Sequence, residues 1–338
     1  MPPIPLVTYT RGALAESTHY GSVAVAQPDG SLVAFAGDPQ RLTTMRSSAK
    51  PFQAMVVVAT GAAERFQMTP QELAVIAGSH SGQLMHTMTV AGLLSRAGLG
   101  PGSLQCGVHA PYHEPTAREL LRRGEAPTAL HHNCSGKHCG MLCACVAAGW
   151  DTTTYPEPDH PLQRAILAEL VRMARLSRAQ VQTATDGCGV PTFAVPLASF
   201  ARAFALLATP ETLNGDQRDS STRVRDAMLM HPEMVGGDDR FDTDLMRAAH
   251  GRVLTKAGAE ACHGAAVLGQ QLGIAVKIED GSARAAPIVV CEVLRQLGVL
   301  GEDELAAVER YAHPLVRSPR GEVSGAGMPV FELTLVRG

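Results

Sequence analysis

Short apolar segments on either side of turn-forming residues predict strands at both ends of the chain. Near the N-terminus, residues 22–26 and 32–36 are mainly apolar and flank Pro28-Asp29-Gly30. Proline, aspartate and glycine favour turns, so this pattern predicts a β-hairpin. In the C-terminal region, residues 274–278 and the residues from 283 onward flank a second such turn, and residues 330–336 predict another strand.

Helical patterns fill the middle of the chain. Thr69-Pro70-Gln71-Glu72 has the threonine–glutamate spacing of a capping box and proline at the first helical position, which predicts a helix that continues through residue 77. Apolar residues recur at helical spacing in later segments. We expect these further helices over residues 84–97, 162–176, 197–208, 220–230 and 287–297.

This order of elements predicts an α/β fold with one sheet built from both termini. The sheet is expected over about residues 5–45 and 255–338, with a helical region over about 46–254. No repeat or linker divides the chain, so we expect residues 1–338 to form a single catalytic unit. A doubly wound parallel fold is disfavoured because strands and helices do not alternate regularly and no phosphate-binding glycine loop follows a strand.

Composition excludes several classes of partner. The chain has 338 residues and a formal net charge of −3, which gives no electrostatic reason to expect binding to nucleic acid or to an anionic membrane. No apolar run approaches the ~20 residues of a membrane span, and the first residues lack the pattern of a signal peptide. The eight cysteines are therefore expected to be free thiols, ligands or nucleophiles in a reducing compartment, the cytoplasm.

Lysine is unusually rare. Of 29 basic residues, only Lys50, Lys137, Lys256 and Lys277 are lysines. Codon bias alone could leave a few random lysines. However, lysine can act as a neutral amine when it is buried, whereas arginine stays protonated. The surroundings of each lysine therefore indicate where such chemistry could lie.

Lys50 follows Ser47 by three residues and precedes Pro51. A helical turn would place the hydroxyl and the amine on one face, at a helix N-terminus whose dipole depresses the lysine pKa. In this Ser-x-x-Lys arrangement a desolvated lysine can accept the serine proton. The alternative is an ordinary N-cap serine, because chance matches to such a short motif are common.

Lys256 lies in Thr255-Lys256-Ala257-Gly258, shortly before the C-terminal strands. It resembles the Lys-Thr-Gly element of serine β-lactamases and penicillin-binding proteins, in which a strand lysine faces a Ser-x-x-Lys pair. Ser79, in Ser79-His80-Ser81-Gly82, would be the middle serine element. Lys277 alternates with apolar neighbours and is expected on the solvent face of a strand.

Lys137 lies in Asn133-Cys134-Ser135-Gly136-Lys137-His138-Cys139, and Cys188 follows in Asp186-Gly187-Cys188-Gly189. Thiols and an imidazole are soft ligands that suit zinc. No paired Cys-x-x-Cys units occur, so a closed zinc finger is not expected. The alternative is that these are buried free cysteines at a helix start.

Together these motifs resemble the asparaginase II family, the rhizobial-type, thermolabile L-asparaginases. The resemblance extends from residues 16–21 to residues 277–281 and depends most on the motif at residues 133–138. It implies a serine-β-lactamase-like fold, a homodimer, and hydrolysis of L-asparagine to L-aspartate and ammonia. It also implies two Ser–Lys pairs, Ser47 with Lys50 and Ser79 with Lys256.

The same resemblance implies a zinc ion (Zn2+) held by Cys134, Lys137 and Cys188. A lysine can ligate a metal only as the neutral amine, which arginine could not supply. Three positions depart from the family pattern: Cys139 stands in place of a small residue, Gln83 in place of a glutamate, and Asp242 where some members carry a cysteine near the substrate. Candidate substrate contacts are Arg46, His138 and Asp242.

The resulting hypothesis is a zinc-containing L-asparaginase in which Ser47 or Ser79 attacks the side-chain amide and a lysine acts as general base. Backbone N–H groups at the start of the Ser47 helix are candidate oxyanion donors. An alternative is a related Ser–Lys amidohydrolase that acts on glutamine, a peptide or a β-lactam. A zinc or thiol redox sensor is a third possibility, but it would leave Ser47, Lys50 and Lys256 without a role.

Overall fold

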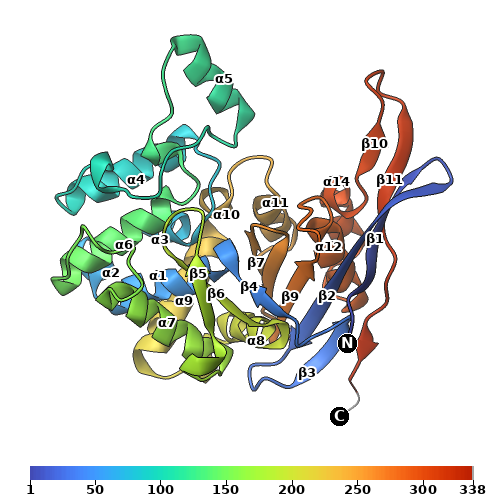
Figure 1. The fold of residues 1–338 in the computed structure, drawn as a ribbon, viewed down its shortest axis with the longest axis horizontal. Coiled ribbons are helices and arrows are strands. Elements are labelled where there is room, and N and C mark those ends of the chain that lie inside the picture. The colour runs from blue at the N-terminus through green and yellow to red at the C-terminus, as the bar shows by residue number, and fades with distance from the viewer. Residues whose placement is uncertain (337–338) are drawn as a thin grey trace. The chain divides into compact units, whose positions relative to one another are not determined.

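The structure, a computed structural model, describes residues 1–336 of the 338-residue chain and contains two compact units. The first unit combines residues 1–48 and 194–209 with the chain from residue 244 onward, and the second combines residues 49–193 and 210–243. The first unit thus holds both the N-terminal strands, blue in Figure 1, and the C-terminal strands, orange to red.

Nine strands of the first unit form one antiparallel sheet within the described residues. Its main path runs β10-β11-β1-β2-β9-β8-β7, and β3 pairs with both β2 and β12. A tenth strand, β4, pairs with the end of β6 outside this sheet. The bounds are β1 (Ile4–Arg11), β2 (Leu14–Ala26), β3 (Leu32–Ala36), β4 (Leu42–Thr44), β7 (Val253–Gly258), β8 (Cys262–Val267), β9 (Leu272–Ile278), β10 (Leu315–Arg317), β11 (Val323–Pro329) and β12 (Thr334–Leu335).

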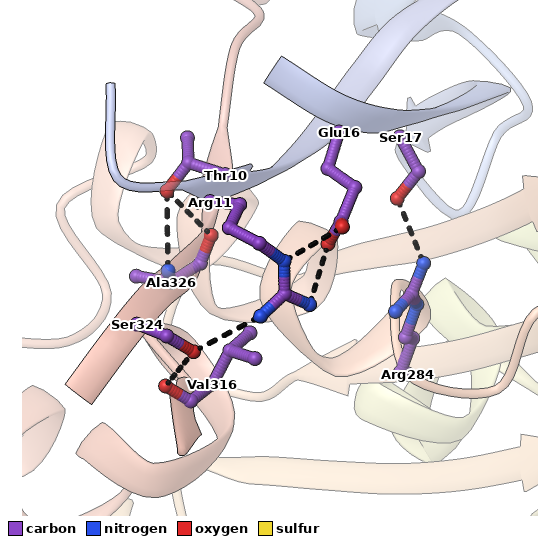
Figure 2. Close-up of polar contacts among 8 residues, drawn as sticks. All are labelled: Thr10, Arg11, Glu16, Ser17, Arg284, Val316, Ser324 and Ala326. Carbon is purple, nitrogen blue, oxygen red and sulfur yellow. Dashed lines mark hydrogen bonds and ion pairs between the residues drawn. The ribbon is translucent and has the colours of Figure 1, made fainter. Parts of the chain in front are cut away.

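Polar side chains tie the first hairpin to the C-terminal strands (Figure 2). Arg11 at the end of β1 binds both carboxylate oxygens of Glu16 on β2, at 2.7 and 2.9 Å, and donates to Ser324 Oγ on β11 at 3.2 Å. Thr10 Oγ1 accepts the backbone N–H of Ala326 at 3.2 Å. Segments more than 300 residues apart in sequence are therefore joined by side chains as well as by the strand ladder.

Helices of the first unit cover this sheet. They are α8 (Leu197–Ala208), α12 (Ala286–Gln296), α13 (Glu302–Ala307) and α14 (Glu309–Ala312). α8 packs on β2, β8 and β9, and α12 packs on β1, β8, β9 and β11. Gly273 of β9 permits the close approach of α8, because a Cβ there would collide with the backbone of Ala201 and Ala205.

The second unit is mainly helical. Its elements are α1 (Lys50–Ala59), α2 (Ala62–Arg65), α3 (Pro70–Ala77), α4 (Leu84–Arg96), α5 (Glu114–Arg123), α6 (Ser135–Ala148), α7 (Pro161–Ala174), α9 (Gly215–Met230), α10 (Pro232–Val235) and the short strand β5 (Gln182–Thr185). α1 is buried from Lys50 to Val58 and packs against α3, α6, α7 and α9. A helix that is apolar on all sides is stable only in such a central position.

Three elements cross the boundary between the two sets of residues: the 3₁₀ turn Arg46–Ala49, strand β6 (Pro191–Pro196) and helix α11 (Phe241–Ala248). Further 3₁₀ turns span Pro101–Ser103, Ala129–His131, Arg178–Gln180 and Pro210–Thr212. No helix within residues 1–336 combines the length and apolar character needed to cross a membrane.

Most of the predicted elements are confirmed, as is the α/β arrangement with a sheet built from both termini. The hairpin around Pro28-Asp29-Gly30 is β2–β3, and α3 has the predicted capping box on Thr69 and Glu72. The expected strand from residue 283 onward is wrong, because the chain turns there into α12. The strand expected over residues 330–336 is reduced to β12. The prediction of a single catalytic unit stays a prediction.

Candidate active site

Lys50 begins α1, and its side chain is 1% exposed. Its Nζ lies 2.8 Å from Ser79 Oγ, 2.7 Å from the carbonyl oxygen of Gly78 and 3.1 Å from that of Asn133. Burial lowers the pKa of Lys50 below its ordinary value, and the charge of Cys134 opposes this shift only in part. The lowered pKa shifts the protonation equilibrium of Lys50 toward the neutral amine.

These contacts match the geometry of a neutral amine. Such an amine has two N–H bonds and one lone pair, and the site offers two carbonyl oxygens that can only accept, from Gly78 and Asn133. If both N–H bonds point to the carbonyls, the lone pair faces the hydroxyl of Ser79. A base oriented in this way can remove the serine proton, which is what nucleophilic attack requires.

Ser79 lies in the loop that follows α3, and α10 and the glycine-rich segment after it hold this loop in place. The backbone N–H of Ser79 donates to Val235 O at 2.8 Å, and Ser81 Oγ donates to Gly236 O at 2.8 Å. Gln83, at the end of the loop, forms a reciprocal pair with Asp238: its Nε2 donates to Oδ2 at 2.7 Å, and the backbone N–H of Asp238 donates to Gln83 Oε1 at 2.9 Å.

The Gln83 side chain therefore links the Ser79 loop to Asp238 through two hydrogen bonds. A glutamate would place a second carboxylate against Asp238 at the same spot. The glutamine in place of the family's glutamate is thus compatible with Asp238, its hydrogen-bonding partner.

A buried cluster of two thiols and one amine lies in the same unit. Lys137 Nζ donates to Cys188 Sγ at 2.8 Å, and the side chains of Cys134 and Cys188 are within hydrogen-bonding distance of each other. All three residues are buried. The hydrogen bond from Cys188 and the nearby charges of Lys50 and Lys137 hold the pKa of the Cys134 thiol well below its usual range. This thiol is therefore ready to act as an anionic ligand.

The donors fit a zinc ion. Within residues 1–336 no three His, Cys, Asp or Glu side chains are grouped so that they could hold a metal ion. A zinc ion on Cys134 and Cys188 with Lys137 would therefore depend on an unusual set of two thiolates and one neutral amine. Burial acts to lower the pKa of Lys137, but the charges of the two cysteines outweigh it and raise the pKa. A metal must therefore displace a firmly held proton from the amine.

Two histidines accept hydrogen bonds from backbone N–H groups near this cluster. His80 accepts the backbone N–H of Gly82 on Nδ1 at 3.1 Å, so its proton is on Nε2, which lies 2.9 Å from Ser135 Oγ. Ser135 in turn donates to Leu130 O at 2.9 Å, so its hydroxyl is fully engaged and offers no nucleophile. His132 Nδ1 accepts the backbone N–H of Cys134 at 3.0 Å.

Ser47 belongs to the first unit, in a turn that is held to the sheet. Ser48 Oγ donates to the carbonyl oxygen of Lys256 at 2.8 Å, and Cys262 Sγ donates to Met45 O at 2.9 Å. Arg46, directly before Ser47, has a φ of 47°, a left-handed conformation that costs energy in a residue with a Cβ. The residue before a predicted nucleophile is therefore strained and fixed in place.

Lys256 is fully buried on β7, and its Nζ donates to Ala257 O at 2.6 Å. Of the two predicted Ser–Lys pairs, Ser47 and Lys256 lie in the first unit and Lys50 and Ser79 in the second. The contact of Lys50 with Ser79 joins one member of each predicted pair. The pairings of Ser47 with Lys50 and of Ser79 with Lys256 stay predictions.

The candidate substrate contacts are spread over both units. His138 is fully buried on α6, and Asp242 is buried at the start of α11, while Arg46 is half-buried. Tyr155 was not anticipated, although its hydroxyl lies 2.6 Å from His138 Nδ1. It sits in a loop without periodicity, and no sequence signal marks it.

Solved structures match this chain at low TM-scores. A protein named Mglu, in its native form, matches with a TM-score of 0.45 and 13% identity over 84% of this chain and 66% of its own, so the chain spans just under two thirds of Mglu. A β-lactamase from Mycobacterium bovis matches with a TM-score of 0.42 and 16% identity, covering 82% of this chain and 94% of its own. A β-lactamase-type protein from Bacteroides dorei matches with a TM-score of 0.44 and 11% identity, covering 81% and 92%.

None of the curated proteins matches the sequence significantly. A model of the L-asparaginase II family matches residues 7–328. This match includes every residue of the two Ser–Lys motifs and of the Cys134–Lys137–Cys188 cluster. The chain belongs to the L-asparaginase II family.

Proposed function

We propose that this protein is an L-asparaginase that hydrolyses the side-chain amide of L-asparagine to L-aspartate and ammonia. Family membership supports an amidohydrolase, and asparagine is the substrate that the family's name gives. The contact that supports the chemistry is the 2.8 Å approach of Lys50 Nζ to Ser79 Oγ in a buried site.

The proposed reaction starts with removal of the Ser79 proton by Lys50. The serine oxygen attacks the amide carbon of the substrate, and the lysine then gives its proton to the departing nitrogen, which leaves as ammonia. In the second half, Lys50 removes a proton from water, the water oxygen attacks the acyl carbon, and Ser79 recovers its proton as aspartate leaves. Ser47 remains the alternative nucleophile.

The carbonyl groups around Lys50 have a defined role in this scheme. Gly78 O and Asn133 O each accept one N–H, which directs the lone pair of the neutral amine at Ser79 before the attack. The backbone N–H of Ser79 donates to Val235 O and is not available to an oxyanion. Stabilisation of the oxyanion must therefore come from another donor.

Zinc is proposed as a resident ion on Cys134, Lys137 and Cys188, where it would order the segments that carry these residues. Asn133, whose carbonyl accepts from Lys50, directly precedes Cys134. An ordered cluster would thus fix one of the two carbonyls that orient the base. A homodimer in the cytoplasm remains an expectation from the family resemblance and from the free cysteines.

Ammonia release with L-asparagine and with L-glutamine, and the absorbance change of a chromogenic β-lactam, test the substrate. We expect the largest kcat/KM with L-asparagine. A larger kcat/KM with L-glutamine would favour the related amidohydrolase, and turnover of the β-lactam alone would contradict the proposal. Absence of turnover with every amide would favour the thiol-based sensor.

A further inference from the structure

His138 carries an unused hydrogen-bonding atom inside the second unit. Its side chain is fully buried, and Nε2 makes no hydrogen bond with any residue from 1 to 336. A buried imidazole nitrogen without a partner is costly, because it has lost its water without a replacement. We therefore expect Nε2 to gain a hydrogen-bonding partner when a ligand binds.

The proton positions around His138 follow from its partners. The backbone N–H of Gln105 donates to Tyr155 Oη at 3.0 Å, so the phenol already accepts one hydrogen bond. Its own proton is then free to donate to His138 Nδ1, 2.6 Å away. Nδ1 is thus the acceptor of the imidazole, and the ring proton is on Nε2.

The surroundings favour this neutral ring. The side chain is fully buried on α6, an environment that disfavours a charged imidazole. The Tyr155 ring meets the imidazole edge-on, with an interplanar angle of 78°. Gln163 Nε2 donates to the carbonyl oxygen of Tyr155 at 2.8 Å and fixes the backbone that carries the phenol.

His138 lies beside the thiol–amine cluster of Cys134, Lys137 and Cys188. His138 lies one helical turn after Cys134, and its backbone N–H donates to Cys134 O at 3.0 Å. The electrostatic interactions of its ring include those with Lys137 and Cys134 of this cluster and with Lys50 of the Lys50–Ser79 pair. A neutral N–H donor at this place suits an oxygen that is negative or becomes so.

We propose that Tyr155 is a positioning residue that holds His138 in the Nε2–H tautomer, and that this N–H donates to an oxygen atom bound in the Lys50–Ser79 site. The inference rests on the proposed function and supplies a donor that the Ser79 backbone cannot. The oxygen comes either from the substrate or from a water on the metal. In both cases the oxygen accepts a hydrogen bond from the buried Nε2–H of His138.

Nitrogen-15 NMR of the histidine rings tests the tautomer directly, with the His138→Gln variant identifying the signals of residue 138. We expect Nε2 to be protonated in the wild type and the two tautomers to be mixed in Tyr155→Phe. An Nδ1-protonated ring in the wild type would overturn the proposal. If the imidazole of Tyr155→Phe stayed entirely in the Nε2–H form, Tyr155 would not be the residue that positions the ring.

The same signals identify the acceptor. L-aspartate and zinc ions are added separately to the metal-free protein. A shift of the Nε2–H resonance with L-aspartate assigns the oxygen to the substrate, and a shift with zinc alone assigns it to a metal-bound water. When L-aspartate is bound, as judged by its inhibition of ammonia release, the absence of a shift with either probe refutes the donor role. Failure of L-aspartate to bind at all counts instead against the proposed function.

Kinetics separate positioning from folding. Tyr155→Phe should lower kcat about tenfold, the equivalent of one lost hydrogen bond, with a smaller change in KM. His138→Gln, whose amide can replace the Nε2–H donor, should retain more activity than His138→Ala. Tyr311→Phe is the matched control, because its hydroxyl donates to Asp244 in the first unit. Equal losses in His138→Gln and His138→Ala, at unchanged thermal stability, would contradict the donor role.

Discussion

Lys50 Nζ lies 2.8 Å from Ser79 Oγ, although the two residues are 29 positions apart in the sequence. The serine three positions before Lys50 is the one that the motif suggested. The fold instead brings a second serine, on a different loop, against the buried amine. This contact determines which variants distinguish the two nucleophiles.

Ser79→Ala should lower kcat by at least about a thousandfold, because it removes the hydroxyl that faces the base. Lys50→Arg should be equally damaging, since a guanidinium cannot become neutral. Ser81→Ala, on the same loop, removes only a hydrogen bond to Gly236 O and should retain most activity. Ammonia release measures all three. If Ser47→Ala abolished turnover while Ser79→Ala preserved it, Ser47 would be the nucleophile.

Lys137→Arg should release the metal, because arginine cannot offer a neutral amine to zinc. Elemental analysis of the purified protein should find zinc in the wild type and little in the variant. Lys277→Arg is the matched control: this lysine is half-exposed, contacts the carbonyl oxygen of Glu260, and lies outside the cluster. An unchanged zinc content in Lys137→Arg would exclude Lys137 as a ligand.

Gly136→Ala should destabilise the protein by about 1–3 kcal/mol, the usual cost of overpacking. The new Cβ would collide with the backbone carbonyl of Val75, where α3 and α6 approach each other next to the site. Gly92→Ala, on α4, has open space around its Cβ and should stabilise the helix by about 0.5–1 kcal/mol. Urea unfolding compares the two. Equal effects would mean that the α3–α6 contact is not as tight as described.

Ser48→Ala should cost about 0.5–1.5 kcal/mol, because it removes a buried hydrogen bond to the carbonyl oxygen of Lys256. The change should also loosen the turn that carries Ser47 and lower activity beyond any loss of stability. Ser324→Ala, which removes a hydrogen bond to Val316 O at the surface, should change stability by less than about 0.5 kcal/mol. Thermal unfolding and ammonia release are measured on the same samples. Identical results for the two variants would count against a role for the Ser48–Lys256 hydrogen bond in holding the turn that carries Ser47.

The ion pair of Arg41 with Glu279 should contribute to stability only above acidic pH. Hydrogen bonds from Arg41 lower the pKa of Glu279, so the stabilisation is present above the ordinary carboxyl pKa and is lost as the pH falls through the lowered value. Because both side chains are partly exposed, the effect should be at most about 1 kcal/mol. Arg41→Gln should therefore reduce the free energy of unfolding at pH 7 but not near pH 3. A constant difference across this range would point to lost packing instead.

Local chemistry made several elements predictable. The capping box at Thr69 and the turn at residues 28–30 depend only on neighbouring side chains and backbone preferences, and both are present. The strand expected after residue 283 was wrong, because the apolar residues there form α12, which the helical spacing over residues 287–297 had indicated. Helix α6 was harder to predict, since its cysteines and glycines are buried on all sides and show no amphipathic period.

The sequence by itself determined the family, the two Ser–Lys motifs and the short list of titratable groups, because each is a matter of residue type and local spacing. Only the tertiary structure decided that Lys50 faces Ser79, that Gly78 and Asn133 orient its amine, and that Tyr155 sets the His138 proton. Desolvation and hydrogen-bond partners act through space. They join residues whose separation along the chain carries no signal of their contact.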